Sequence, residues 1–131
     1  RKFFLSSDFD PNVQYSLKQG SSRARFEYNM KLRRENREYQ MAPMSFGWTF
    51  NSLIVCKKIF KRKTINSIKT PILLITADND TVVNNKMHYT FNEKCNCCEL
   101  VNIEDGTHAL LASDSNTLTR IMNLTLSFFA D

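Results

Sequence analysis

The sequence predicts an α/β protein, and this chain supplies the carboxyl-terminal part of its parallel sheet. The apolar run Ile72–Ile75 is typical of a strand buried on both faces of such a sheet. A predicted helix over 84–94 and a predicted strand over 99–103 follow, and this crossover is long enough for a parallel connection. Two parallel strands are not stable alone, so we expect the neighbouring strands to come from outside this chain.

The residues before this unit predict helices that lie over the core. Residues 1–20 are turn-rich, and Ser22 is a plausible N-cap for a basic helix from Arg23 to about Glu38, with Phe26 and Met30 as its apolar stripe. Residues 42–47 break the pattern. A second helix, from about Trp48 to Phe60, offers apolar side chains to a partner: Phe50, Leu53, Ile54 and Val55. We therefore expect a cap over 1–66 and a core segment over 67–131.

The helices of the core segment have apolar positions that predict their buried faces. On the helix over 84–94 these positions are Met87 and Phe91. On a final helix over 115–129 they are Leu118, Ile121, Met122 and Phe129.

Length and composition indicate one modest core. The chain has 131 residues, of which 42% are hydrophobic. No apolar run approaches the roughly 20 residues of a membrane-spanning helix, and the start of the sequence lacks the pattern of a signal peptide. We expect a cytoplasmic protein.

The net charge of +5 is uneven, and the excess lies mostly in two basic stretches, 23–37 and 57–63. One interpretation of the second stretch is peripheral contact with an anionic membrane surface, where each cation adds on the order of 1 kcal/mol. The alternative is a solvated helix end, with cations near the terminal carbonyl groups. Nucleic-acid binding is not predicted, because no stacking platform accompanies the charge. The cations concerned are Lys57, Lys58, Lys61, Arg62 and Lys63.

The cysteines do not predict a metal site. Cys95, Cys97 and Cys98 form a C-x-C-C group, while Cys56 is distant in the sequence. A structural zinc site usually combines paired C-x(2–4)-C clusters or a histidine pair. We expect reduced, partly buried thiols beside a strand, which suit a reducing compartment.

Asp80 and His108 are the candidate catalytic residues. Each lies on a loop that follows a predicted strand, and functional residues of open α/β sheets lie at these carboxyl ends. Neighbouring strands bring the two loops together, so an acid there can orient the imidazole while the histidine takes a proton from a serine.

The third member of such a triad is expected in a G-x-S-x-G elbow, which lifts the serine hydroxyl out of the sheet. The chain has three glycines, Gly20, Gly47 and Gly106, and no two of them stand four residues apart. The elbow is therefore absent from this sequence. We expect the nucleophile to lie upstream of Arg1.

The stretches Pro71–Ile75 and Val82–Phe91 resemble the lysophospholipase L2 branch of the α/β hydrolases, and monoacylglycerol lipases are close relatives of that branch. The similarity covers about residues 20–131. It continues through Gly106-Thr107-His108 and Phe128-Phe129, and more faintly through Arg23–Asn29 and Ser45–Trp48.

The resemblance implies the C-terminal part of a serine hydrolase that cleaves lipid esters, without cofactor or metal, and that requires the N-terminal half of the fold. It makes Asp80, the residue before Thr81-Val82-Val83, the triad acid, and leaves Asp78 as the runner-up. Relatives often have Asp where this chain has Asn84. His88 matches a family position, but we interpret it as structural.

Three of these interpretations have alternatives. Phe46, Trp48 and Phe50 would line an acyl-chain entrance if the resemblance holds, although aromatic residues on a helix more often serve packing. The substrate could be a lysophospholipid, a monoacylglycerol, another carboxylester or a peptide. The alternative from another class is a non-catalytic hydrolase remnant or interaction module.

Overall fold

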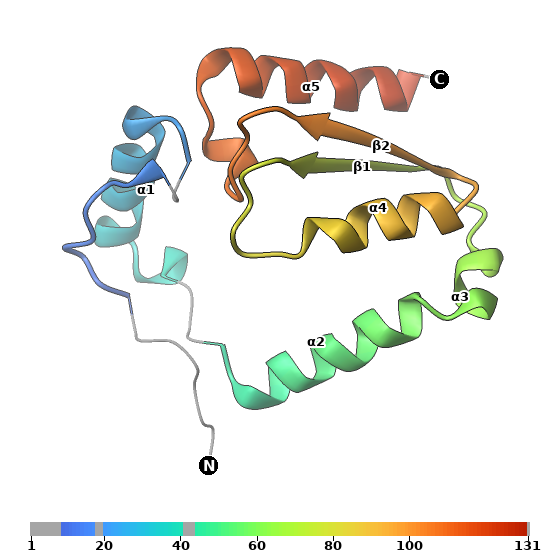
Figure 1. Cartoon of the computed structure of the whole chain (residues 1–131). Coiled ribbons are helices and arrows are strands. Elements are labelled where there is room, and N and C mark those ends of the chain that lie inside the picture. The colour runs from blue at the N-terminus through green and yellow to red at the C-terminus, as the bar shows by residue number, and fades with distance from the viewer. Residues whose placement is uncertain (1–8, 18–19, 41–43, 131) are drawn as a thin grey trace.

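The computed structural model describes residues 9–17, 20–40 and 44–130, and contains helices on both faces of a two-stranded sheet (Figure 1). In chain order, the elements before the sheet are α1 (Arg23–Glu35), a 3-10 turn at Arg37–Tyr39, α2 (Phe46–Ile59) and α3 (Arg62–Ser67). They are followed by β1 (Ile72–Ala77), α4 (Asn85–Lys94), β2 (Cys98–Ile103), the 3-10 turn η3 (Leu110–Ala112) and α5 (Ser115–Ala130).

The strands confirm the predicted β-α-β unit. β1 and β2 pair in parallel over their whole length, from Ile72 opposite Cys98 to Ala77 opposite Ile103. Figure 1 shows α5 along one face of this pair and α4 along the other. The mixed helices and parallel strands agree with a partial α/β fold, and the carboxyl ends of both strands meet at one edge.

The helix boundaries depart from the prediction where capping residues decide them. The Ser45 side chain accepts a hydrogen bond from the Trp48 amide, so α2 begins at Phe46 and not at Trp48. α1 ends at Glu35, because Asn36 turns to an extended conformation and its amide bonds the Leu32 carbonyl. The short helix α3 was not predicted, since six largely polar residues give no readable apolar period.

The predicted burial of the strands and of two helix faces is partly wrong. Ile72–Ile75 are half-buried, and only Thr76 and Ala77 of β1 are buried. On α5, Ile121 is buried but Met122 is exposed and Phe129 is 80% exposed; Met87 on α4 is also exposed. A two-stranded sheet leaves its edges open and offers too little surface to cover these faces, which explains the difference.

α1 is attached to the core at the carboxyl edge of the sheet. The Ser22 amide donates to the Ala112 carbonyl at 3.1 Å, and the Arg25 guanidinium donates to the Ser113 carbonyl. Gly20 has φ 112°, and a Cβ there would stand 2.5 Å from the Ala112 oxygen, so only glycine fits this contact. The N-terminus of α1 is therefore held against the segment that follows His108.

The two-part division at residue 66 stays a prediction. Residues 9–16 contain turns and no helix or strand, as the turn-rich interpretation of residues 1–20 predicts. Residues 1–8 and 18–19 lie outside the described residues.

Candidate catalytic site

Backbone hydrogen bonds join the two loops that carry the predicted acid and base. The Asp78 amide donates to the Ile103 carbonyl at 3.2 Å, and the Asn79 amide donates to the Gly106 carbonyl at 2.9 Å. Both bonds continue the pairing of β1 with β2 past the ends of the strands. The sequence therefore brings Asp80 and His108 together by extending a parallel ladder into the two loops.

The loop after β2 depends on a tight turn at Asp105 and Gly106. The Gly106 amide bonds the Ile103 carbonyl at 3.1 Å, and Asp105 has φ 55°, a left-handed value that Asp adopts more readily than most residues. A Cβ on the buried Gly106 would meet the Ile103 oxygen at 2.9 Å and the Ala77 Cβ at 3.0 Å. Glycine thus permits the close approach that puts His108 beside the β1 loop.

Asp80 and His108 form the hydrogen bond expected of a triad acid and base. His108 Nδ1 lies 2.9 Å from Asp80 Oδ2. An ionised carboxylate only accepts, so Nδ1 carries the proton and Nε2 is left with a free lone pair in the neutral ring. The Asp80 side chain is 7% exposed, whereas the His108 side chain is 46% exposed. The acid is covered and the base faces outward.

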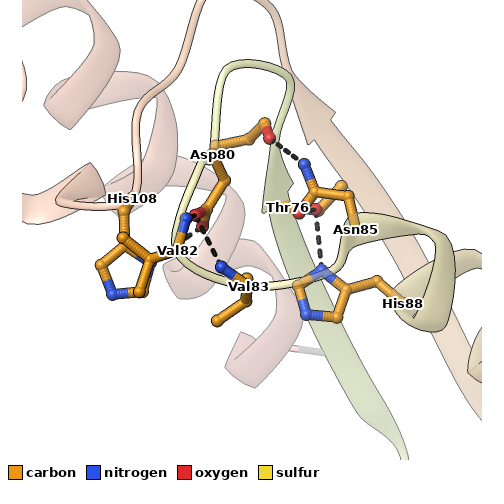
Figure 2. Close-up of polar contacts among 8 residues, drawn as sticks. Thr76, Asp80, Val82, Val83, Asn85, His88 and His108 are labelled. Carbon is orange, nitrogen blue, oxygen red and sulfur yellow. Dashed lines mark hydrogen bonds and ion pairs between the residues drawn. The ribbon is translucent and has the colours of Figure 1, made fainter. Parts of the chain in front are cut away.

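The second carboxylate oxygen of Asp80 is held by the backbone. Oδ1 accepts from the Val82 amide at 2.8 Å and from the Val83 amide at 3.1 Å (Figure 2). The two oxygens therefore have separate tasks, since one fixes the carboxylate to its loop and the other contacts the imidazole.

These contacts also keep the acid ionised. Desolvation works to raise the pKa of the Asp80 carboxyl, but the hydrogen bonds from His108, Val82 and Val83 together outweigh it, so the pKa lies below its usual value. At neutral pH Asp80 is a carboxylate that can stabilise a protonated His108.

Asp78, the alternative acid, has a different partner. Its Oδ1 accepts from the side-chain amide of Asn102 on β2, and the residue is exposed. Asp78 thus links the two strand ends, and Asp80 is the carboxylate in contact with the histidine.

Asn84 and His88 lie in the next part of the chain and contact neither Asp80 nor His108 through a described hydrogen bond. The Asn84 side chain accepts from the Lys86 amide and so caps α4. His88 Nδ1 lies 2.9 Å from the Thr76 hydroxyl, which is also 3.3 Å from Asn85 Oδ1 (Figure 2).

This Thr76 cluster was not predicted from the sequence. Thr76 is buried at the end of β1, and Asn85 Nδ2 also donates to the Ala77 carbonyl at 2.6 Å. The cluster therefore fixes the start of α4 against the end of β1, on either side of the loop that carries Asp80. In the sequence, the sign of this cluster was Thr76, a polar residue near the end of an otherwise apolar strand.

A pocket of about 390 Å³ lies beside His108. Its lining comes from three segments: the β1 loop, the β2 loop and the chain before α1. Phe46, Trp48 and Phe50, predicted to line an acyl-chain entrance, are not among its residues, and all three are exposed on α2. The pocket is lined by Leu17, Ser21, Asn79, Thr81, Asp105, Thr107 and His108.

Ser21 is the serine of this pocket, but its hydroxyl is engaged elsewhere. Ser21 Oγ accepts from the Asp114 amide at 2.9 Å and lies 3.2 Å from Asp114 Oδ2, to which it donates. The Ser21 hydroxyl therefore uses its proton and one lone pair in hydrogen bonds to Asp114, the residue before α5. Ser21 does not take the place of the missing elbow serine.

None of the four cysteines lines the pocket beside His108. Cys95 is buried and Cys56 exposed, all four cysteines are free, and Cys95 Sγ lies 3.6 Å from Cys97 Sγ. Desolvation raises the pKa of Cys97 and of Cys98. Within the described residues, no three His, Cys, Asp or Glu side chains converge in a way that could hold a metal ion.

No family model matches the chain, and a search of curated proteins returns no match. In the part of the chain that the structure describes, no helix has both the length and the apolar character needed to cross a membrane.

Proposed function

We propose that this chain supplies the acid and the general base of a serine hydrolase that cleaves lipid esters, with Asp80 and His108 in those roles. The observation that carries the proposal is the hydrogen bond from His108 Nδ1 to an Asp80 carboxylate whose other oxygen is held by two amides. It leaves Nε2 of an exposed ring free to accept a proton. The nucleophilic serine belongs to a segment outside these 131 residues.

In the proposed reaction, His108 Nε2 takes the proton of the serine hydroxyl as the serine oxygen attacks the ester carbonyl. Asp80 holds the ring in the Nδ1–H tautomer and stabilises the imidazolium that forms. The imidazolium then protonates the departing alcohol, and the acyl group stays on the serine. The same nitrogen then takes a proton from water as the water oxygen attacks the acyl carbon. The bond to the serine oxygen breaks, the imidazolium returns the proton to that oxygen, and the fatty acid leaves.

The hydrogen-bonded pair of Asp80 and His108 supports a hydrolase. The choice of a lipid ester rests on the resemblance of residues 71–91 to lysophospholipase L2. The pocket beside His108 has Leu17 as an apolar wall and Thr81 and Thr107 as polar ones. Such a lining suits an ester group with an attached apolar chain. It does not distinguish a lysophospholipid from a monoacylglycerol.

A fluorophosphonate probe tests the proposal. The product of the complete reading frame that contains these residues is exposed to the probe, and the intact mass of every polypeptide is measured. We expect one adduct on a serine outside residues 1–131, formed as the serine displaces fluoride, and its loss in His108→Ala. Absence of an adduct in the folded wild-type protein would contradict the hydrolase proposal and favour the non-catalytic remnant.

A further inference from the structure

A second candidate surface lies on α2 and the junction that follows it. Its apolar part consists of Trp48, Phe50, Leu53 and Val55, all of which are more than half exposed. Its cationic part, which we name the junction cluster, is exposed throughout and consists of Lys57, Lys58, Lys61, Arg62 and Lys63. Neither part lines the pocket beside His108.

The apolar part is unusual for a helix facing water. Trp48 and Val55 lie on one side of α2, whereas Phe50 and Leu53 lie on the opposite side, because the two pairs are half a turn apart at 100° per residue. A helix that is apolar on several sides is normally buried. Figure 1 shows α2 apart from the sheet, beyond α4, and a link between the two helices is the edge contact of Phe60 with Phe91, at 6.1 Å between ring centroids.

Along the chain, the charge on both sides of the junction cluster is of one sign. The sequence has no Asp or Glu from Tyr39 to Ala77, a stretch that contains Lys69 in addition to the five cations of the cluster. By contrast, α1 balances part of its charge internally, with the ion pairs Arg23–Glu27 and Lys31–Glu35. No described carboxylate forms an ion pair with the junction cluster. Its charge is therefore available to an external anion.

We propose that α2 and the junction cluster form the contact surface for an anionic lipid bilayer. The apolar part lies along α2, and the cationic part begins in its last turn and continues into the start of α3, with Trp48 about 15 Å from Lys58 at the helical rise of 1.5 Å per residue. A tilted α2 can therefore insert its first turns among the acyl chains while its last turn and Lys61–Lys63 remain at the phosphate groups. Apolar insertion and attraction to anionic lipid together give stronger binding than either alone.

Other occupants fit the surface less well. A nucleic acid would use the cations and the aromatic faces of Trp48 and Phe50, but it would leave the exposed aliphatic side chains of Leu53 and Val55 uncovered. A second copy with α2 paired in parallel would bring the like-charged junction clusters together, and antiparallel pairing would leave the cations without an anionic partner. A lipid surface covers the aliphatic and aromatic side chains and also supplies anions for the junction cluster.

The chain contains a single tryptophan, so Trp48 reports directly on insertion. The full chain is mixed with vesicles of phosphatidylcholine alone or with added phosphatidylserine, at low and high salt. With the anionic vesicles at low salt, we expect a blue shift of Trp48 emission and its quenching by lipids brominated in the acyl chains. Phosphatidylcholine alone should give little of either.

A charge variant and a matched control test the contribution of the junction cluster. Replacing all five cations of the junction cluster by Gln should lower partitioning to anionic vesicles by at least roughly 100-fold, because each cation near the surface contributes severalfold. The matched control replaces five exposed cations elsewhere by Gln and should reduce partitioning far less: Lys31, Arg37, Lys86, Lys94 and Arg120. Far-UV circular dichroism checks that both variants keep the wild-type helix content.

Three results would overturn the proposal: unchanged Trp48 emission with anionic vesicles, equal partitioning of the two variants, or Trp48 shielding that appears on self-association without lipid. Salt-sensitive binding to an oligonucleotide with no response to vesicles would assign the surface to nucleic acid instead. Because the assay does not involve Asp80, His108 or ester cleavage, its outcome is independent of the hydrolase proposal.

Discussion

His108 Nδ1 and Asp80 Oδ2 lie 2.9 Å apart across two loops, while Asp80 Oδ1 is held by the Val82 and Val83 amides. The carboxylate is oriented before it meets the imidazole, and the imidazole is left with one nitrogen facing outward. This relationship divides the roles of the two residues: Asp80 orients, and His108 exchanges the proton.

His108→Ala should lower ester hydrolysis by the complete enzyme by about 10⁴-fold or more, the loss expected when the base of such a triad is removed. Folding should change little, because the side chain is about half exposed and its described hydrogen bond is the one to Asp80. The rate of hydrolysis of a soluble ester and the melting temperature measure the two effects. The matched control is His88→Gln, which should keep activity within a few-fold. A catalytically competent His108→Ala enzyme would remove His108 from the mechanism.

Asp80→Asn should cost roughly 10⁴-fold in kcat, as expected for the amide substitution of a triad acid. The Asn oxygen can still accept from Val82 and Val83, so its nitrogen would face His108 Nδ1 and disfavour the proton there. Asp78→Asn is the control, since its partner is Asn102, and it should lose far less activity. The reverse order of the two losses would move the acid to Asp78.

Acid should destabilise the chain partly through Asp80. Its pKa is lowered in the folded state, so an unfolded chain takes up the proton first as the pH falls through about 4, the usual value for Asp. The stabilisation from this group is complete above that pH and is lost progressively below it. Urea unfolding at a series of pH values gives the free energy of unfolding. Below about pH 5, this free energy should depend less on pH in Asp80→Asn than in the wild type. Parallel curves for the two proteins would show that the Asp80 contacts contribute nothing to stability.

Gly106→Ala should destabilise the fold by about 1–3 kcal/mol, the usual cost of forcing an extra carbon into a packed site. The new Cβ would stand 2.9 Å from the Ile103 oxygen, next to the turn that presents His108. Gly47→Ala is the matched control, because the nearest atom to its Cβ is Ser45 Oγ at 3.9 Å, and it lies in α2. That change should be neutral or stabilising by up to about 1 kcal/mol. Equal unfolding free energies for the two variants would contradict the close packing at Gly106.

The sequence was most informative where local patterns decide the structure. The apolar run at 72–75, the helix after it and the second strand lie where they were predicted, and the loops at their ends bring Asp80 and His108 together. Ser22 caps α1, as its position before the basic helix indicated. Asp80 could be preferred over Asp78 only through a resemblance, because both carboxylates follow the same strand and neither spacing nor composition separates them.

The features that were not predicted depend on tertiary contacts, which the pattern of residues along the sequence does not contain. The Thr76 cluster joins a strand to a helix through side chains nine and twelve residues away. The exposure of Phe129 and Met87 could not be anticipated, since an apolar helix stripe indicates that something covers it but not that the covering surface belongs to the same chain. The left-handed Asp105 likewise appears only once the β2 turn is built.

The tautomer of His108 is the most direct test of the account, and the 131-residue chain alone permits it. The chain has two histidines, so ¹⁵N-detected imidazole spectra of wild type and His88→Gln assign both rings. In the neutral ring of His108 we predict a proton on Nδ1 and a bare Nε2, with a shift of the proton to Nε2 in Asp80→Asn. A neutral His108 protonated on Nε2 in the wild-type chain would contradict the proposed acid–base pair.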